Sequence, residues 1–449
     1  MAKSKYQDRT ITSYQSMKDE IQPLPIKNYD SEFCGSIPIQ LINLIQPHGF
    51  VMLLDQSFTI VQVSENVKQH LHTEARQLLH HKFTTLLSPE QQGTFRKKLA
   101  GRKRHHRIPH VLKLKVDGQS QRFASTILVY PDHYLLEMEP LEEESNDITF
   151  IRAYQDIKAI TTAMQEAEDI RSMSSIAAQE IKAFSGFDRV MIYRFDSAWN
   201  GTVIAEAQQA DMEPYLGLTF PASDVPRQAR ELYFRNPYRL IPDINFEPAR
   251  LFPVVNPIIN GFTNLSECSL RGVPQVHVEY MNNMGVQASM STPIIVDGQL
   301  WGLISCHHKS PNWVPFEMRY AFEVLSEMIS SQVASRQRAD RLTVINSKRS
   351  TELTIIDHIY RREDLFALLQ EKAKPLLSLL EAGGATLMID NQTESIGNTP
   401  EEKHIKELLK WLRLYKKEKI YLTNSLVRDF GKADAFTAEA SGLLAIQFS

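Results

Sequence analysis

The first part of the chain alternates between short apolar runs and polar residues, a pattern typical of strands in an antiparallel sheet. Five stretches show it: residues 49–55, 58–63, 111–116, 123–129 and 134–138. Gln56-Ser57 and Asp117-Gly118 supply tight turns, and residues 64–99 carry helical periodicity. Two strands, helices and three further strands predict one α+β domain that ends at the charged residues 142–147.

A second unit mixes helices and strands in the same way. An amphipathic helix is expected over residues 149–183, and four strand patterns follow it: residues 188–196, 202–207, 286–296 and 299–308. Residues 274–284 predict another helix, with Pro at its start and Gly just after its end. Because His277 and Tyr280 are three residues apart, they share one face of that helix.

The last part of the chain begins with one long helical pattern over residues 315–357. Its apolar stripe from Phe322 to Ile356 exceeds what a connection within one domain requires, so we expect a parallel homodimer through this helix. Further helices and strands are expected after it: residues 363–382, 385–389, 400–416 and 442–448. The chain stops directly after the last strand, so we expect the third domain to be incomplete.

Composition narrows the class of protein. The 449 residues are 43% hydrophobic and 23% charged, which suits about three globular domains, and a net charge of −3 offers no general attraction to nucleic acid. No apolar run reaches the roughly 18 residues of a membrane helix, so we expect a cytoplasmic protein without a membrane anchor. Three cysteines, Cys34, Cys268 and Cys306, are too few and too scattered for a disulfide framework or a metal site.

The stretch Phe220-Pro-Ala-Ser-Asp-Val-Pro226 has the composition of a helix start. Ser223 or Asp224 is a candidate cap, and Pro226 suits the first turn. Unpaired N–H groups at a helix start can hold a polar ligand, although a capped surface helix is the simpler interpretation of these residues alone.

Four motifs in a fixed order resemble the photosensory part of bacterial phytochromes: IQPHG (45–49), PASDVP (221–226), LRGVPQVHVEYMNNMG (270–285) and LWGLISCHH (300–308). The resemblance covers residues 29–449 and implies an α+β chain with five parts: a flexible arm (1–28), a PAS domain (29–141), a GAF domain (147–314), a connecting helix (315–357) and a partial PHY domain without its tongue hairpin (358–449). It also implies a figure-of-eight knot, in which Ile45 threads a lasso formed by residues 242–269.

The same resemblance implies a covalently bound linear tetrapyrrole. Cys34 lies eleven residues before Ile45, where bacterial phytochromes attach biliverdin through a thioether. Plant-like members carry the attachment cysteine immediately before the helix histidine, and this chain has Val276 there. Cys268 is a weaker candidate for the attachment site. Cys306 lies in an apolar strand, so we expect it to be a core residue.

Polar residues of the GAF domain would hold the two propionates of such a bilin. By resemblance, one propionate would lie against Arg239 and Arg271, with Tyr233 nearby. The other would lie against three residues: Ser289, Ser291 and His277. Taken singly, each arginine would be interpreted as a surface charge and the histidine as a core residue. Their assignment as propionate ligands therefore depends on the motifs around them.

The remaining contacts would surround the pyrroles and the outer ring. The backbone of Asp224 would accept hydrogen bonds from pyrrole N–H groups, and its carboxylate would face the PHY domain. Tyr193, Phe220 and Tyr280 would form the walls around the outer ring, and His307 would bond to its carbonyl.

The hairpin around Asp297-Gly298 allows a sharper expectation. A two-residue turn would place Ser289 opposite Cys306, whereas the bilin pocket needs Ser289 and His307 on one face of the sheet. We therefore expect a longer loop, residues 297–299, that sets Ser289 against His307.

Two functions from different classes fit these residues. The first is a red/far-red photoreceptor that signals by bilin photoisomerisation, with its output in a histidine kinase or another module outside this chain. The second is a GAF module that senses a diffusible ligand such as a cyclic nucleotide, with Arg271 and the helix start at Asp224 on its phosphate. A cysteine-dependent enzyme lacks a base partner at a recognisable spacing, and no catalytic module is visible. Without a tongue, the photoreceptor would leave Asp224 solvated and would photoconvert incompletely.

Overall fold

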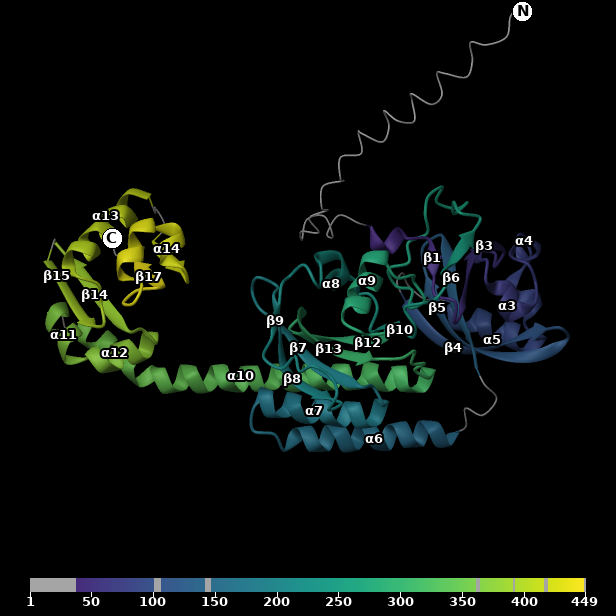
Figure 1. The fold of residues 1–449 in the computed structure, drawn as a ribbon, viewed down its shortest axis with the longest axis horizontal. Coiled ribbons are helices and arrows are strands. Elements are labelled where there is room, and N and C mark those ends of the chain that lie inside the picture. The colour runs from purple at the N-terminus through teal and green to yellow at the C-terminus, as the bar shows by residue number, and fades with distance from the viewer. Residues whose placement is uncertain are drawn as a thin grey trace, which may run out of the picture. The chain divides into compact units, whose positions relative to one another are not determined.

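The structure is a computed structural model that describes residues 38–100, 106–141, 147–360, 364–390, 392–415 and 419–447. The chain divides into two compact units, Met1–Arg336 and Gln337–Ser449. The first unit holds two sheets and the second holds two small hairpin-like sheets (Figure 1). The α+β class with antiparallel sheets and flanking helices, which the sequence predicts, is confirmed.

The PAS sheet forms from all five predicted strands. Their bounds are β2 (Phe50–Asp55), β3 (Ile60–Ser64), β4 (His106–Val116), β5 (Gln119–Val129) and β6 (His133–Pro140). The predicted helical stretch becomes several short helices: α3 (Val67–Leu71), α4 (Ala75–Leu78), η2 (Phe83–Leu86) and α5 (Pro89–Leu99). Strand β4 begins five residues before the predicted start at Val111, because its full length pairs with β5.

Two further strands extend this sheet, β1 from the start of the PAS domain and β11 from the GAF sequence, and its order is β1-β11-β3-β2-β6-β5-β4. Strand β1 (Leu44–Ile45) pairs with β11 (Ala249–Phe252), and β11 pairs in turn with β3. On its other side, the segment accepts a hydrogen bond from Gly272 N at Leu44 O (2.7 Å), and Ile45 bridges to Arg271. The buried Ile45 therefore lies between the two limbs of the loop after β10, as threading requires.

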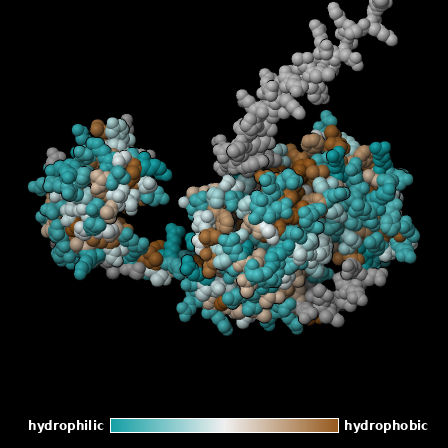
Figure 2. Space-filling view, viewed as in Figure 1, coloured by the Kyte–Doolittle hydropathy of each residue, from teal (hydrophilic) through white to brown (hydrophobic). Residues whose placement is uncertain are grey.

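This loop carries exposed apolar side chains near its tip: Val254, Val255, Ile259 and Phe262. Figure 2 shows apolar surface over this part of the first unit, above β1 and β6 in the view of Figure 1.

The GAF sheet has the order β10-β12-β13-β7-β8-β9. Its strands are β7 (Arg189–Phe195), β8 (Gly201–Gln208), β9 (Thr219–Phe220), β10 (Arg239–Ile241), β12 (Ala288–Val296) and β13 (Gln299–His308). The shorter helices α8 (Arg227–Leu232) and α9 (Gln275–Asn283) lie between strands in sequence. Helices α6 and α7 and the first half of α10 cover one face of this sheet (Figure 1), where they share one apolar core with it.

The single helix expected over residues 149–183 is wrong, because two helices occupy this stretch. Helix α6 spans Asp147–Gln165 and α7 spans Ile170–Ser185. Asp169 caps α7: its carboxylate accepts from Ser172 N (2.6 Å), and Ser172 Oγ accepts from Asp169 N (3.1 Å). This reciprocal capping satisfies the backbone at a new helix start and lets the chain reverse between two packed helices.

The register of the β12–β13 hairpin confirms the predicted pairing and corrects its cause. Ser289 pairs with His307. The turn is nevertheless the two-residue Asp297-Gly298, with φ angles of 48° and 76°, as a tight hairpin turn requires. A β-bulge shifts the register instead, because Ile295 pairs with Leu300 while Ile294 pairs with Gly302, which leaves Trp301 as the extra residue.

Helix α10 spans Phe316–Tyr360, close to the predicted bounds. The first half of its apolar stripe is buried in the GAF core, including Phe322, Leu325, Ile329 and Val333. That half is therefore not available for a partner helix. The stripe of the second half is exposed, with Leu342 58% and Ile345 49% accessible to solvent, so a dimer contact through this helix has to rest on the second half.

The second unit contains both predicted strands, found as β14 and β17, and two strands that the sequence did not predict, β15 and β16. Its elements are α11 (Leu365–Glu371), α12 (Ala373–Leu380), β14 (Gly384–Ile389), β15 (Gln392–Gly397), α13 (Glu402–Tyr415), β16 (Ile420–Thr423), α14 (Leu426–Asp429), η3 (Gly431–Phe436) and β17 (Leu443–Ile446). The single helix expected over 363–382 is wrong, because Lys372 leaves helical geometry between α11 and α12. Within the described residues, no helix combines the length and apolarity needed to cross a membrane.

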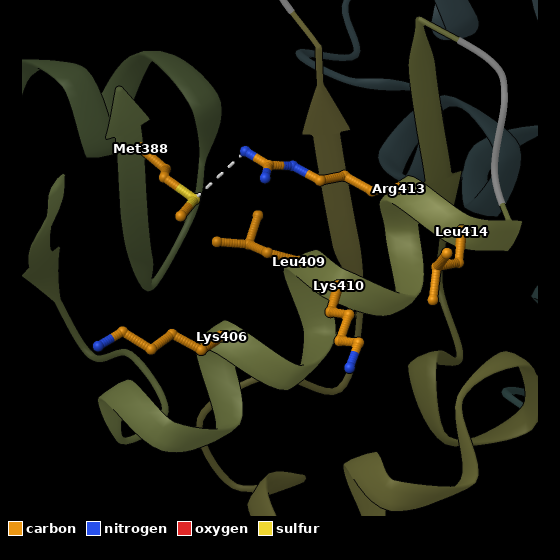
Figure 3. Close-up of a pocket in the computed structure, with 6 residues that line it drawn as sticks. All are labelled: Met388, Lys406, Leu409, Lys410, Arg413 and Leu414. Atoms are coloured by element: carbon orange, nitrogen blue, oxygen red, sulfur yellow. Dashed lines mark hydrogen bonds between the residues drawn. The ribbon is translucent and has the colours of Figure 1, made fainter. Parts of the chain in front are cut away.

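An open cavity of about 500 Å³ lies in this unit between α13 and β14. Figure 3 shows the side chains of Lys406, Lys410 and Arg413 along one side of α13, with Arg413 reaching toward Met388. The cavity contains none of the site residues that the sequence predicts.

Candidate ligand-binding site

The predicted site residues of the GAF sheet share its face away from the helices. Neighbours in the same strands, Leu240, Met290 and Cys306, belong to the core that the helices cover. Because successive residues of a strand point to opposite faces, Arg239, Ser289, Ser291 and His307 point to the other face. Tyr193 belongs to a separate apolar cluster on that second face.

Strand pairing brings these polar residues together. Arg239 pairs with Ser291 across β10 and β12, and Ser289 pairs with His307 across β12 and β13. The hydroxyl groups of Tyr233 and Ser291 are hydrogen-bonded at 2.7 Å, which places the end of helix α8 over the same face. Five of the predicted residues thus form one polar strip across three adjacent strands.

Two guanidinium groups enter this strip with carbonyl oxygens as their hydrogen-bond partners. Arg239 donates to Arg271 O (2.7 Å) and Gly272 O (2.9 Å), and Arg271 donates to Leu265 O and Ser266 O (both 3.4 Å). Among the described residues, neither guanidinium has a carboxylate within ion-pair distance. Burial and the neighbouring Arg271 lower the pKa of Arg239 to about 9, and burial also lowers the pKa of Arg271. A buried cation without a counter-ion is costly, so the site favours an anionic ligand.

Two imidazoles next to these cations are held neutral. Burial, together with the charge of Arg239, lowers the pKa of His277 to about 4. Burial, with Arg189 and His277, lowers the pKa of His307 to about 3. His307 Nδ1 is buried without a hydrogen-bond partner among the described residues, while Nε2 lies 3.4 Å from Ser305 Oγ. A ligand group that hydrogen-bonds His307 Nδ1 would satisfy this atom.

The third side of the site is aromatic. His277 and Tyr280 stack with ring centroids 6.1 Å apart, and Tyr280 donates to Asp224 Oδ2 (3.2 Å). Tyr193 and Phe220 lie 6.2 Å apart in the apolar cluster of this face. Burial raises the pKa of Asp224, and Tyr280 partly offsets this by donating to the carboxylate.

Helix α8 does not start as the sequence predicts. Pro226 occupies the N-cap position, and neither Ser223 nor Asp224 caps the helix. Asp224 N closes a turn onto Pro221 O (3.0 Å), and its carboxylate turns toward Tyr280. The loop is held instead by Arg230, which donates to Val225 O (2.6 Å). With only six residues, α8 offers little of the partial charge that a ligand would need at a helix start.

The two described cysteines are poor nucleophiles. Cys268 and Cys306 are fully buried, and burial raises the pKa of both thiols. The core position predicted for Cys306 is confirmed. Since the thiolate is the reactive form, neither is suited to attack a ligand. Cys34 lies outside the described residues.

Sequence reasoning missed a buried ion pair that supports this face. Arg189 on β7 pairs with Glu206 on β8 at 3.0 Å, and the Glu206 carboxylate accepts from Tyr215 N (2.8 Å). Arg189 also lies over the Tyr215 ring, 3.9 Å from its centroid, and Tyr215 contacts Phe220. The sequence did show Arg189 and Glu206 as charged residues within two predicted strands. It did not show that both side chains lie on the same face of the sheet.

The arrangement thus combines two cations that have no carboxylate partner in the described part of the chain, hydroxyl and neutral imidazole groups, and an aromatic wall on one face of the GAF sheet. The eleven predicted residues within the described part of the chain lie on or beside this face, and their contacts with a ligand stay a prediction. A large, flat, conjugated ligand with carboxylates matches this set: the cations suit its acids, the imidazoles its polar edge, and the aromatic rings its faces.

Family comparisons agree with this order of domains. The chain matches the family models described as PAS fold (residues 34–141), GAF domain (169–336) and Phytochrome region (348–449). It is 35% identical over 423 residues to "Cyanobacterial phytochrome B" of a Nostoc species, covering 94% of this chain and 56% of that protein. It is 32% identical to the "Bacteriophytochrome" of Pseudomonas aeruginosa, covering 84% of this chain and 50% of that protein.

Solved structures show the same similarity in three dimensions. The phytochrome photosensory core module of Stigmatella aurantiaca superimposes with a TM-score of 0.82 at 34% identity, covering 93% of this chain and 82% of that one. A bacteriophytochrome from R. palustris gives a TM-score of 0.82 at 31% identity, covering 92% of this chain and 83% of that one.

The order of the domains, the threaded segment and the cationic face of the GAF sheet define a photosensory module of the PAS-GAF-PHY class. The chain belongs to the phytochrome family. It spans about half the length of the curated relatives that it matches.

Proposed function

We propose that this chain is the light-sensing part of a red/far-red photoreceptor and that it binds biliverdin, a linear tetrapyrrole, through a thioether to Cys34. One observation carries the proposal: Arg239 donates to the backbone carbonyl of Arg271, Arg271 is buried and Arg239 is half-buried, and neither has a carboxylate within ion-pair distance among the described residues. A cofactor with two propionates supplies the missing charge.

Different residues of the site would bind the two propionates of such a cofactor. Arg239 and Arg271 would bind one propionate, and the Tyr233 hydroxyl, already bonded to Ser291, would border it. The second propionate would lie against hydroxyl and imidazole donors: Ser289, Ser291 and His277. Neutral imidazole keeps an N–H donor without adding a third buried charge, which suits a site that already holds two cations.

The outer ring would lie among the aromatic side chains. Tyr193, Phe220 and Tyr280 would exclude water from it, and His307 would hydrogen-bond its carbonyl through Nδ1, which has no partner within the ranges that the structure describes. The backbone carbonyl of Asp224 would accept from the pyrrole N–H groups. When bound, the bilin would supply light absorption and isomerisation, while these side chains would hold its pyrroles and surround its outer ring.

Attachment through Cys34 has a chemical argument as well as the resemblance. Addition of a thiol to a vinyl group forms one carbon–sulfur bond and moves the thiol proton to the neighbouring carbon, and it needs an accessible thiolate. The buried thiols of Cys268 and Cys306 have raised pKa values, which opposes both requirements.

Mixing the chain with biliverdin tests the proposal directly. A red-absorbing band with a shape unlike that of free biliverdin, and a difference spectrum after red light, are expected. Cys34→Ser should still bind biliverdin but lose it on denaturation, whereas Cys268→Ser should retain it, as judged by zinc-stained fluorescence on a denaturing gel. Covalent bilin retained in the Cys34 variant would move the attachment to another residue, and the absence of any new band would refute the photoreceptor.

A GAF module that senses a cyclic nucleotide would use the same cations. The described site favours it less, because its aromatic wall and paired imidazoles extend well beyond what a phosphate needs, and helix α8 is too short to add charge. Calorimetric binding of a cyclic nucleotide together with no biliverdin spectrum would reverse this ranking.

The partners belong to the same proposal. We expect a parallel homodimer through the second half of α10, a histidine kinase or another output module elsewhere in the complete protein, and a cytoplasmic location. The exposed Leu342 and Ile345 are the observation that supports the dimer.

A further inference from the structure

The PAS sheet presents two charged side chains, one buried and one half-buried, to the GAF loop that threads around β1. Arg107 lies on β4 and Glu137 on β6, and Glu137 is only 4% exposed. Along β6, Leu135 belongs to the apolar cluster shared with this loop, whereas Leu136 belongs to the PAS core. Glu137 therefore points, like Leu135, toward the loop and away from its own domain's core.

Both charges hold the backbone of residues 267–270. Glu137 Oε2 accepts from Ser269 N (2.8 Å) and Leu270 N (3.2 Å). Arg107 donates to Glu267 O (2.9 Å) and to Ser269 Oγ (2.8 Å). Each of these side chains makes two hydrogen bonds to the segment, Glu137 to two adjacent N–H groups and Arg107 to a carbonyl and a hydroxyl. Two bonds from one side chain fix both the position and the orientation of a segment.

The same loop orients the two cations of the ligand site. The Arg239 guanidinium donates to the carbonyl oxygens of Arg271 and Gly272, directly after the residues that Glu137 holds, and to that of Ser269 (3.4 Å). The Arg271 guanidinium is held by the carbonyl oxygens of Leu265 and Ser266, directly before the residues that Arg107 holds. The carbonyl oxygens that bind the two guanidinium groups therefore all lie in or within two residues of the segment 267–270, which the PAS sheet holds.

We propose that Glu137 and Arg107 of the PAS domain are positioning residues for the anionic ligand, and that they act by fixing the loop whose carbonyl oxygens aim Arg239 and Arg271. The proposal rests on the proposed function, since the ligand is the bilin carboxylate. It assigns the PAS domain a part in ligand recognition at a distance, although neither residue belongs to the predicted ligand contacts.

Charge supports this role beyond geometry. Burial lowers the pKa of Arg271, and three neighbours oppose that effect, in the order Cys268, Tyr233 and Glu137. Burial raises the pKa of Glu137 itself. The positive charge of Arg107 is the largest of the effects that lower this pKa. The two PAS residues therefore support each other as well as the loop.

The test compares two ligands that differ only in charge. Biliverdin carries two carboxylates and its dimethyl ester carries none, and the Cys34→Ser background makes binding of both reversible, so that Kd follows from absorbance titration. Glu137→Gln keeps the shape but removes the charge that holds two N–H groups, and about ten-fold weaker binding of biliverdin is expected. The dimethyl ester should bind within about two-fold of the background, because it makes no use of the cations. Arg107→Gln should show the same selectivity.

Leu136→Ala is the matched control. Leu136 is adjacent to Glu137 on β6 but packs into the PAS core, so this change weakens the domain without touching the loop. It should affect both ligands equally or neither. An equal loss for both ligands in Glu137→Gln, or no loss for biliverdin, would overturn the proposal.

A second measurement needs no ligand. Hydrogen exchange of the Ser269 and Leu270 amides in the apoprotein should become faster in Glu137→Gln and stay unchanged in Leu136→Ala, apart from any general loss of stability. Unchanged exchange in Glu137→Gln would refute the hold on the loop. If the wild-type chain binds no biliverdin, the proposed function fails and the ligand part of this proposal fails with it, whereas the exchange result still decides whether Glu137 fixes the loop.

Discussion

Acidification should destabilise the apoprotein through its buried imidazoles, and His277→Gln isolates one of them. The pKa of His277 is about 4 in the folded chain, against an ordinary value of 6.5. Between these values the unfolded chain binds a proton that the folded chain excludes, so stability is lost as pH falls from about 6.5 toward 4. The full difference of about 2.5 corresponds to about 3.4 kcal/mol, of which about 2 kcal/mol is lost between pH 7 and pH 5.

Urea denaturation of the apoprotein at pH 7 and pH 5, followed by tryptophan fluorescence, measures this loss. In His277→Gln the drop in unfolding free energy should be about 2 kcal/mol smaller than in the wild type, whatever the change does to stability at pH 7. His81→Gln is the control, because it makes the same substitution at an exposed histidine outside the ligand site. A drop of equal size in the wild type and in His277→Gln would show that His277 is not held neutral by burial.

Three further outcomes follow from the packing. Arg319→Met should cost about 3–5 kcal/mol, because it leaves Glu139 as a buried charge without its 2.7 Å partner, and adding Glu139→Gln should recover at least half of that loss in the same urea assay. Gly201→Ala should cost about 1–3 kcal/mol, because the new methyl group would overlap the Tyr193 ring, whereas Gly93→Ala in the open interior of α5 should be neutral or stabilising. Sedimentation at micromolar concentration should show a dimer that Leu342→Glu dissociates; a monomeric wild type would remove the inference about α10 without touching the ligand site.

Local sequence patterns predicted much of the fold because most elements carry their own periodicity. The strands at 49–55 and 134–138 and the helix at 274–284 needed only alternation or a proline start. The break between α6 and α7 was missed although Asp169 and Ser172 were visible, because the apolar pattern continues through them and capping is a weaker signal than periodicity.

The site was predicted through motifs, and the structure shows why spacing alone was insufficient. Ser289 faces His307 because of a bulge at Trp301, and a bulge leaves no mark in the alternation of β13. The loop-length argument reached the correct pairing by the wrong route. Contacts such as Arg107 with Ser269 join residues 162 apart in sequence, so only the folded chain reveals that the PAS sheet supports the cations.

The sharing of one sheet by β1, β11 and the PAS strands changes what a cut in the chain would do. In most two-domain proteins, proteolysis of the linker frees two independent bodies. Here β11 belongs to the GAF sequence but is hydrogen-bonded within the PAS sheet, and the fully buried Ile45 lies inside the GAF loop. A cut within residues 142–146 would therefore break the peptide chain without separating its halves, and their release would require unfolding of the seven-stranded sheet.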